Sequence, residues 1–147
     1  MCRLERRYRS SAFVGVFITG VIMPPVAVSL ATLILLVLCV FQIALAAGAP
    51  FGRLAWGGAH RLLPVRQRIA SAAAPLIYAF FASFPLQKTG YVDVWPSGWI
   101  EPGIWIIACY LAVSVGLNAM SKSRPERLVM TPVAAALAIL FFIVAFS

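Results

Sequence analysis

Long apolar segments separated by short polar ones dominate the hydrophobic pattern of this chain. Four of them, at residues 26–47, 69–86, 103–119 and 128–146, match or approach the roughly 20 apolar residues that a membrane-spanning helix needs. Backbone groups in lipid must pair within their own segment, which favours helices, and the alternating polarity of barrel strands is missing. We therefore predict an all-α fold, a transmembrane four-helix bundle, in a single domain over residues 23–147.

The composition supports a membrane protein. Apolar residues make up 63% of the chain and charged residues 11%, against about 45–50% and 25% in a soluble domain. So short a chain cannot bury that much apolar surface within itself, so we expect the lipid bilayer to be its main partner. The formal charge of +8 could also suit nucleic acid, but the basic residues lie beside the apolar segments and no nucleic-acid motif accompanies them. We expect no nucleic-acid partner.

Residues 1–22 form a basic and apolar N-terminal extension. Residues 12–22 are apolar but too short to span a bilayer, and Pro24 and Pro25 follow them. The full apolar stretch, 12–47, is much longer than the roughly 7–15 residues of a secretory signal, so we expect the first helix to be retained. Either translation begins at Met23, or residues 12–22 form a short helix that returns the terminus towards the cytoplasm. The distribution of charge favours the first interpretation.

Basic residues in the loops predict how the chain is oriented. Segment 48–68 holds four arginines and segment 121–127 holds three basic residues, whereas the loop between the second and third helices holds Lys88 and two acids. That loop also carries Tyr91, Trp95 and Trp99, as an aromatic belt at a membrane surface would. The first and third loops are therefore expected in the cytoplasm, and the protein in the cell's inner (plasma) membrane as a multi-pass protein.

The polar residues that could form a site gather near the cytoplasmic face. Gln42 and Asn118 lie close to the cytoplasmic ends of their helices, level with a glycine-rich loop whose glycines suit tight turns or close backbone approach. As an alternative to forming a site, these polar residues would serve only to hydrogen-bond helices to one another and to pack the loop. The candidate residues are Gln42, Gly48, Pro50, Gly52, Trp56, Gly57, Gly58, Arg68, Asn118 and Arg127.

Two strings in the chain resemble the signatures of a family of small uncharacterised bacterial four-helix integral membrane proteins. The first comprises Phe41-Gln42, Gly48-Ala49-Pro50, Gly52, Trp56-Gly57-Gly58, Leu63-Pro64 and Arg68-Ile69-Ala70-Ser71. The second comprises Asn118-Ala119, Ser121, Ser123, Glu126-Arg127 and Pro132. The resemblance covers the chain from about residue 26 onwards and implies four helices. It implies no activity, substrate or catalytic residue.

The chain lacks the residue patterns typical of enzymes and metal sites. His60 has no partner ligand, and the cysteines form no CxxC pair, so we predict no metal, no cofactor and no disulfide framework. The acids lie in loops and in the N-terminal extension, so paired carboxylates are missing and we predict no catalytic residue. We also expect no acid inside a helix, which argues against a proton-coupled exporter of the small multidrug type.

A scaffold or accessory protein that binds another membrane protein or itself is the function we expect from these features. A small transporter or channel is the alternative, with Gln42, Tyr78 and Asn118 along a polar path. An enzyme acting on lipid is the third, because basic residues at the cytoplasmic face could hold a head-group phosphate.

Overall fold

The computed structural model describes residues 23–147, which form four long helices and, in two of the three connections, short 3-10 turns. The helices are α2 (Met23–Ala47), α3 (Val65–Lys88), α4 (Ile100–Ala119) and α5 (Arg124–Ala145). The turns η1 (Gly52–Leu54) and η2 (Trp56–Gly58) follow α2, and η3 (Ser97–Trp99) precedes α4. All four helices are long and apolar enough to cross a membrane. The predicted all-α transmembrane four-helix bundle is therefore confirmed, and the chain is a multi-pass membrane protein. The predicted N-terminal extension lies outside the described residues.

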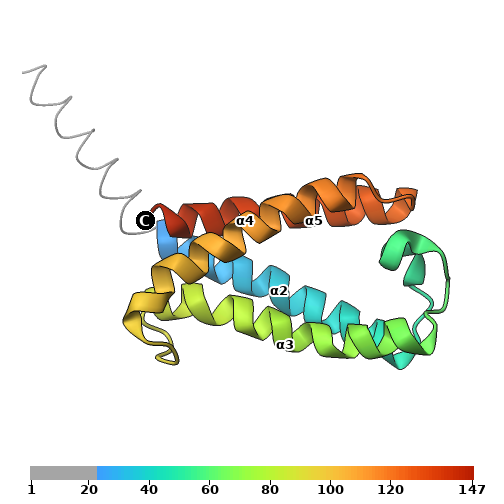
Figure 1. The fold of residues 1–147 in the computed structure, drawn as a ribbon, viewed down its shortest axis with the longest axis horizontal. Coiled ribbons are helices and arrows are strands. Elements are labelled where there is room, and N and C mark those ends of the chain that lie inside the picture. The colour runs from blue at the N-terminus through green and yellow to red at the C-terminus, as the bar shows by residue number, and fades with distance from the viewer. Residues whose placement is uncertain (1–22) are drawn as a thin grey trace, which may run out of the picture.

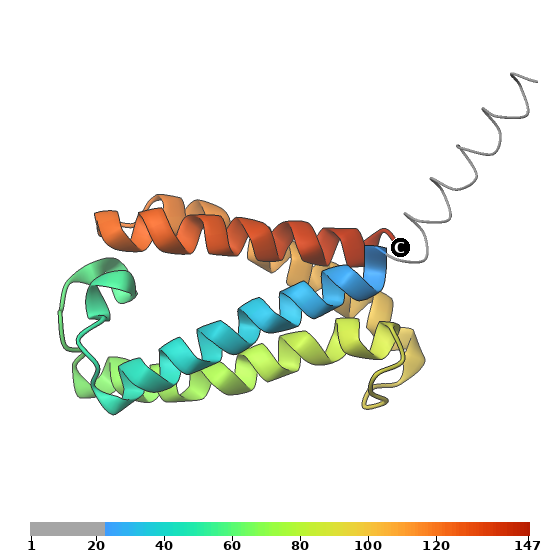
Figure 2. The same cartoon turned by 180° about the vertical axis from the view of Figure 1, so that it is seen from behind.

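The helices form two antiparallel hairpins. Helix α4 packs along α5, α2 packs along α3, and α2 also contacts α5 between the hairpins. Figures 1 and 2 show the hairpins close together at the end where the chain passes from α3 to α4 and farther apart at the other end, where the loop between α2 and α3 lies between them. Val28, Ile104 and Phe141 are fully buried where the helices meet.

A glycine allows the hairpins to meet at the narrow end. A Cβ atom added to Gly103 of α4 would lie only 2.2 Å from the Phe84 ring of α3, so only glycine permits this contact. The Phe84 ring in turn stacks on Trp95, with centroids 5.3 Å apart. Lys88 Nζ donates to the Val144 carbonyl at 2.9 Å and pairs with Glu101 at 2.8 Å. These contacts fix α3, α4 and α5 to one another at this end.

Every helix begins earlier than its apolar segment predicts. Helix α3 begins at Val65 rather than 69, α4 at Ile100 rather than 103, and α5 at Arg124 rather than 128. Helix α2 begins at Met23 rather than 26. Most of the extra residues are charged or are proline, and the first helical turn accepts both because its N–H groups have no partner within the helix. Hydropathy therefore located the part of each helix that suits lipid, not its start.

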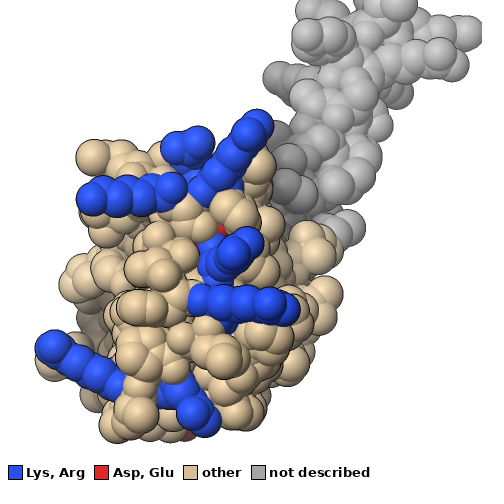
Figure 3. All heavy atoms as spheres, turned by 90° about the vertical axis from the view of Figure 1, so that its right-hand side faces the viewer, with Lys and Arg blue, Asp and Glu red and all other residues tan. Residues whose placement is uncertain are grey.

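The two ends of the bundle differ in charge. Figure 3 views the wide end and shows Lys and Arg side chains spread across it. At the narrow end Lys88 pairs with Glu101, Asp93 accepts a hydrogen bond from Gln87, and Tyr91 and Trp99 are about two-thirds exposed. The bundle thus places the two basic segments at one end and the aromatic loop at the other, which is the grouping that the predicted orientation requires. The basic residues at the wide end are Arg53, Arg61, Arg66, Arg68, Lys122, Arg124 and Arg127.

Candidate functional site

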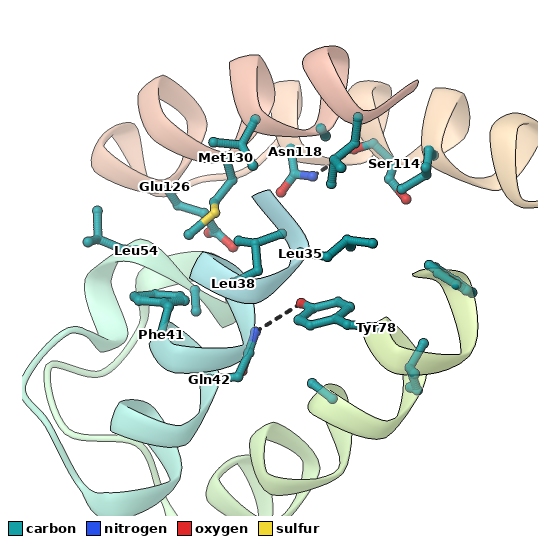
Figure 4. Close-up of a pocket in the computed structure, with 18 of the residues that line it drawn as sticks. Leu35, Leu38, Phe41, Gln42, Leu54, Tyr78, Ser114, Asn118, Glu126 and Met130 are labelled. Carbon is teal, nitrogen blue, oxygen red and sulfur yellow. Dashed lines mark hydrogen bonds between the residues drawn. The ribbon is translucent and has the colours of Figure 1, made fainter. Parts of the chain in front are cut away.

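A cavity of about 560 Å³ lies between the two hairpins and is lined by all four helices and by the loop after α2. It runs from the middle of the bundle towards the basic end, where the hairpins have separated (Figure 4). Leu35, Leu38, Ile77, Phe81 and Leu137 form much of its apolar wall. Its polar lining includes Gln42, Tyr78, Ser114, Asn118 and Glu126.

A hydrogen bond across the cavity joins α2 to α3. Gln42 Nε2 donates to the Tyr78 hydroxyl at 3.4 Å, as the dashed line in Figure 4 marks. The other amide atom, Gln42 Oε1, is buried and has no hydrogen-bond partner among the described residues. A buried acceptor without a partner costs free energy, of the order of 1–3 kcal/mol, so a donor brought to this oxygen would recover part of that cost.

Asn118 also lines the cavity but does not join two helices. Its Nδ2 donates to the Ser114 carbonyl of the same helix at 2.8 Å. The sequence left open whether Asn118 forms a bridge between helices. In the described part of the chain, its side chain makes no hydrogen bond to another helix. Its carbonyl oxygen remains as an acceptor in a cavity-lining side chain.

Glu126 is a cavity residue that the sequence analysis missed. It lies in the first turn of α5 and is only 8% exposed, and Figure 4 shows its carboxylate directed towards Leu38. The carboxylate accepts a hydrogen bond from the Ser121 hydroxyl. The expectation that no acid lies inside a helix is therefore wrong, because α5 begins before Glu126 and α4 before Glu101.

The start of α5 contains the signal that could have located Glu126. The Ser123 hydroxyl accepts the Glu126 N–H at 3.4 Å, so Ser123 caps the helix and Glu126 is its third residue. In a capping box the acid would return to the backbone of Ser123. Here the Ser121 hydroxyl lies between them, accepting the Ser123 N–H at 3.2 Å and donating to Glu126. This arrangement leaves the Glu126 side chain on the inner face of α5.

The loop at residues 56–58 closes the wide end of the cavity and is anchored to both hairpins. Trp56, which lines the cavity, donates from Nε1 to the buried Ser71 hydroxyl of α3 at 3.2 Å. On the other side, Ser123 Oγ donates to the Arg53 carbonyl. A Cβ atom on Gly58 would lie 2.3 Å from Ser123, so glycine is required for this contact.

The remaining predicted residues shape the loop or lie on the surface. Arg68 Nε donates to the Ala46 carbonyl at 2.8 Å, which satisfies the end of α2, while Gly48 turns the chain there with a φ of 97°. Gly52 lies against the backbone of His60, which a Cβ atom would approach to 2.4 Å. Pro50 and Arg127 are exposed and do not line the cavity. Of the ten predicted residues, Gln42, Trp56 and Asn118 meet at the cavity.

Comparison with models of protein families, with curated proteins and with solved structures finds no match to this chain. The family suggested by the two sequence strings therefore stays a prediction. Within residues 23–147, no group of three or more His, Cys, Asp or Glu side chains is placed to hold a metal ion. The cavity is thus the feature of the described chain from which a function can be argued.

Proposed function

We propose that the protein binds a small amphipathic molecule that it takes from the bilayer. The observation that carries this proposal is the cavity, whose volume of about 560 Å³ falls in the range of roughly 300–1,000 Å³ typical of small-molecule sites. Its walls are apolar in the middle of the bundle and polar near the basic end. A molecule with an apolar tail and one polar end matches that distribution.

The side of the bundle between α3 and α4 offers a route from lipid. These neighbouring helices pack against each other much less extensively than α4 packs against α5 or α2 against α3. Ile77 of α3 and Tyr110 of α4 both line the cavity and are 50% and 56% exposed. An amphipathic molecule in the bilayer could therefore pass between these helices with its tail in apolar surroundings throughout.

This proposal develops the transporter alternative rather than the scaffold. Large apolar side chains such as Leu33, Leu36 and Val40 are exposed on α2, but lipid-facing helices expose such residues whether or not a protein partner covers them. A scaffold role stays a prediction. Under our proposal the polar end of the ligand lies near the cytoplasmic face of the inner (plasma) membrane, because the polar lining of the cavity lies near the basic end.

Equilibrium binding to the full chain in nanodiscs of neutral lipid tests the proposal. The ligands are radiolabelled twelve-carbon chains that carry an ammonium, trimethylammonium, hydroxyl or sulfate head group. Ala74→Phe places a ring in the cavity, whereas Ala72→Phe changes an exposed position of the same helix outside the cavity lining. We expect saturable binding of at least one ligand by the native protein and by Ala72→Phe, and a loss of tenfold or more in Ala74→Phe. Binding that is equal in the two variants, or missing throughout, would contradict the proposal.

A further inference from the structure

The polar end of the cavity offers several hydrogen-bond acceptors, one of them a carboxylate. Gln42 Oε1 is buried without a partner, Asn118 donates one of its two amide N–H groups to Ser114 and keeps its oxygen free, and Glu126 presents a carboxylate. The N–H of Trp56 is taken by Ser71. Tyr78 keeps its hydroxyl proton, because its oxygen accepts from Gln42, and the amides of Gln42 and Asn118 each keep one further N–H. A ligand group that donates several hydrogen bonds complements this set.

The distribution of charged residues at this end also favours a ligand group that donates hydrogen bonds and carries positive charge. None of the seven Lys and Arg residues at the wide end lines the cavity, whereas the single acid there, Glu126, does. Arg68, the one of these seven residues that is partly buried, donates to the Ala46 carbonyl. Within residues 23–147, the one ion pair joins Lys88 and Glu101 at the opposite end. The basic surface in Figure 3 therefore contrasts with the lining of the cavity, which holds one acid and no Lys or Arg.

A buried carboxylate is costly unless hydrogen bonds and a positive charge compensate it. Glu126 has a hydrogen bond from Ser121 and the favourable field at the start of α5. Among the described residues it has no cationic side chain within salt-bridge distance. A positively charged ligand group at this point would supply the missing opposite charge.

We infer that the ligand is a hydrophobic primary amine, bound as its ammonium ion. This inference rests on the proposed function and names the substrate class of the same cavity. The ammonium group donates to the Glu126 carboxylate and to the free oxygens of Gln42 and Asn118. The hydrocarbon part lies between the hairpins, against Leu38, Ile77 and Leu137. An anionic head group would instead meet the carboxylate, and a trimethylammonium group would carry the charge without N–H donors.

The head-group series described above tests the inference on the native protein. Binding that Ala74→Phe abolishes is taken as binding in the cavity. We expect the primary ammonium to bind about tenfold or more tightly than the alcohol, as one hydrogen bond to a charged group would give. The trimethylammonium should bind more weakly than the primary ammonium, and the sulfate most weakly of all. Cavity binding in which the alcohol equals the ammonium, or in which the sulfate or trimethylammonium binds tightest, would overturn the inference and leave the proposed function intact. If no ligand binds in the cavity, both fail.

Glu126→Gln provides an independent test. This variant keeps an acceptor oxygen and removes the charge, and Glu101→Gln removes an acid at the far end as the matched control. We expect Glu126→Gln to lose at least tenfold in ammonium affinity while its affinity for the alcohol stays within about threefold of native, and we expect Glu101→Gln to retain both affinities. Retained preference for ammonium in Glu126→Gln would refute the role of the carboxylate. If Glu126→Gln does not fold, the head-group series on the native chain decides the question alone.

Discussion

Three consecutive residues turn the loop at the end of the cavity through left-handed backbone conformations. Trp56, Gly57 and Gly58 have φ values of 56°, 77° and 67°. Glycine adopts this region freely, but a residue such as tryptophan does so at a cost on the order of 1–3 kcal/mol. The bond from the Trp56 indole to Ser71 offsets part of that cost and holds the ring at the cavity. This local geometry places an aromatic side chain where a ligand would lie.

Gly57→Val should destabilise this turn. A β-branched residue is strongly disfavoured at a φ of 77°, although a Cβ atom there would touch nothing within 4 Å. We expect the free energy of unfolding to fall by about 1–3 kcal/mol, measured as thermal stability in mild detergent. Gly116→Val is the control, since Gly116 lies in α4 with open space around it. Equal stability of the two variants would show that the loop does not need a left-handed residue at position 57.

Asn118→Leu should separate binding from folding. Asn118 bonds only to the Ser114 carbonyl of its own helix, and leucine inserts favourably into a membrane helix. We expect the variant to melt within a few degrees of the native protein and to lose about tenfold in affinity for the primary ammonium ligand. Leu117→Ala, on an exposed face of the same helix, should keep native affinity. Native affinity in Asn118→Leu would remove Asn118 from the site, and a large loss of stability would assign it a packing role instead.

At the scale of the helices, the bundle is fixed at its narrow end and opened at its wide end. The contact between Gly103 and Phe84 brings α3 and α4 together, and Trp95 covers Phe84 from the adjoining loop. At the wide end the loop between α2 and α3 lies between the hairpins, whereas elsewhere the helices contact each other directly. Because the hairpins diverge from the narrow end to the wide end, the cavity remains between them.

Gly103→Ala should therefore loosen the bundle at its narrow end. The added methyl group would lie 2.2 Å from the buried Phe84 ring, and overpacking of this kind costs about 1–3 kcal/mol. Gly98→Ala should change stability by less than about 0.5 kcal/mol, because a Cβ atom there meets nothing within 4 Å. Thermal unfolding in detergent compares the two variants. A Gly103→Ala variant as stable as Gly98→Ala would mean that α3 and α4 do not meet as described.

The helices could be predicted from sequence because apolar length alone determines which segments suit lipid. The starts of α3 and α4 could not, since Arg66 and Pro102 read as loop residues and yet lie in first helical turns. The spacing of Ser123 and Glu126, by contrast, does mark the start of α5. The site was predicted in part. Polar residues at helix ends identified Gln42 and Asn118, but pairwise helix packing decides which side chains meet, and the apolar pattern does not specify it. Glu126 was missed for this reason, and Arg127 lies exposed at the wide end, outside the cavity lining.

At the scale of the whole molecule, the chain separates its charges along the bundle axis. Basic residues cover the wide end, and aromatic and acidic residues occupy the narrow end. This asymmetry predicts a cytoplasmic wide end. Single cysteines introduced beside Arg61 or Lys122, with the native cysteines replaced by alanine, should resist a membrane-impermeant thiol reagent in intact cells. A cysteine beside Trp95 should react. The reverse labelling would invert the orientation and place the polar end of the cavity outside.

The central claim is that an amphipathic molecule occupies the cavity between the hairpins. Photolabelling measures this most directly. A twelve-carbon primary amine with a diazirine near the end of its chain is bound to the protein in nanodiscs, irradiated, and its adducts are mapped by peptide mass spectrometry. Our account predicts adducts on cavity residues such as Leu35, Ile77 and Leu137, suppressed by excess unlabelled amine and by Ala74→Phe. Adducts confined to lipid-facing residues such as Leu33, Leu36 and Leu117, unaffected by competitor, would contradict it.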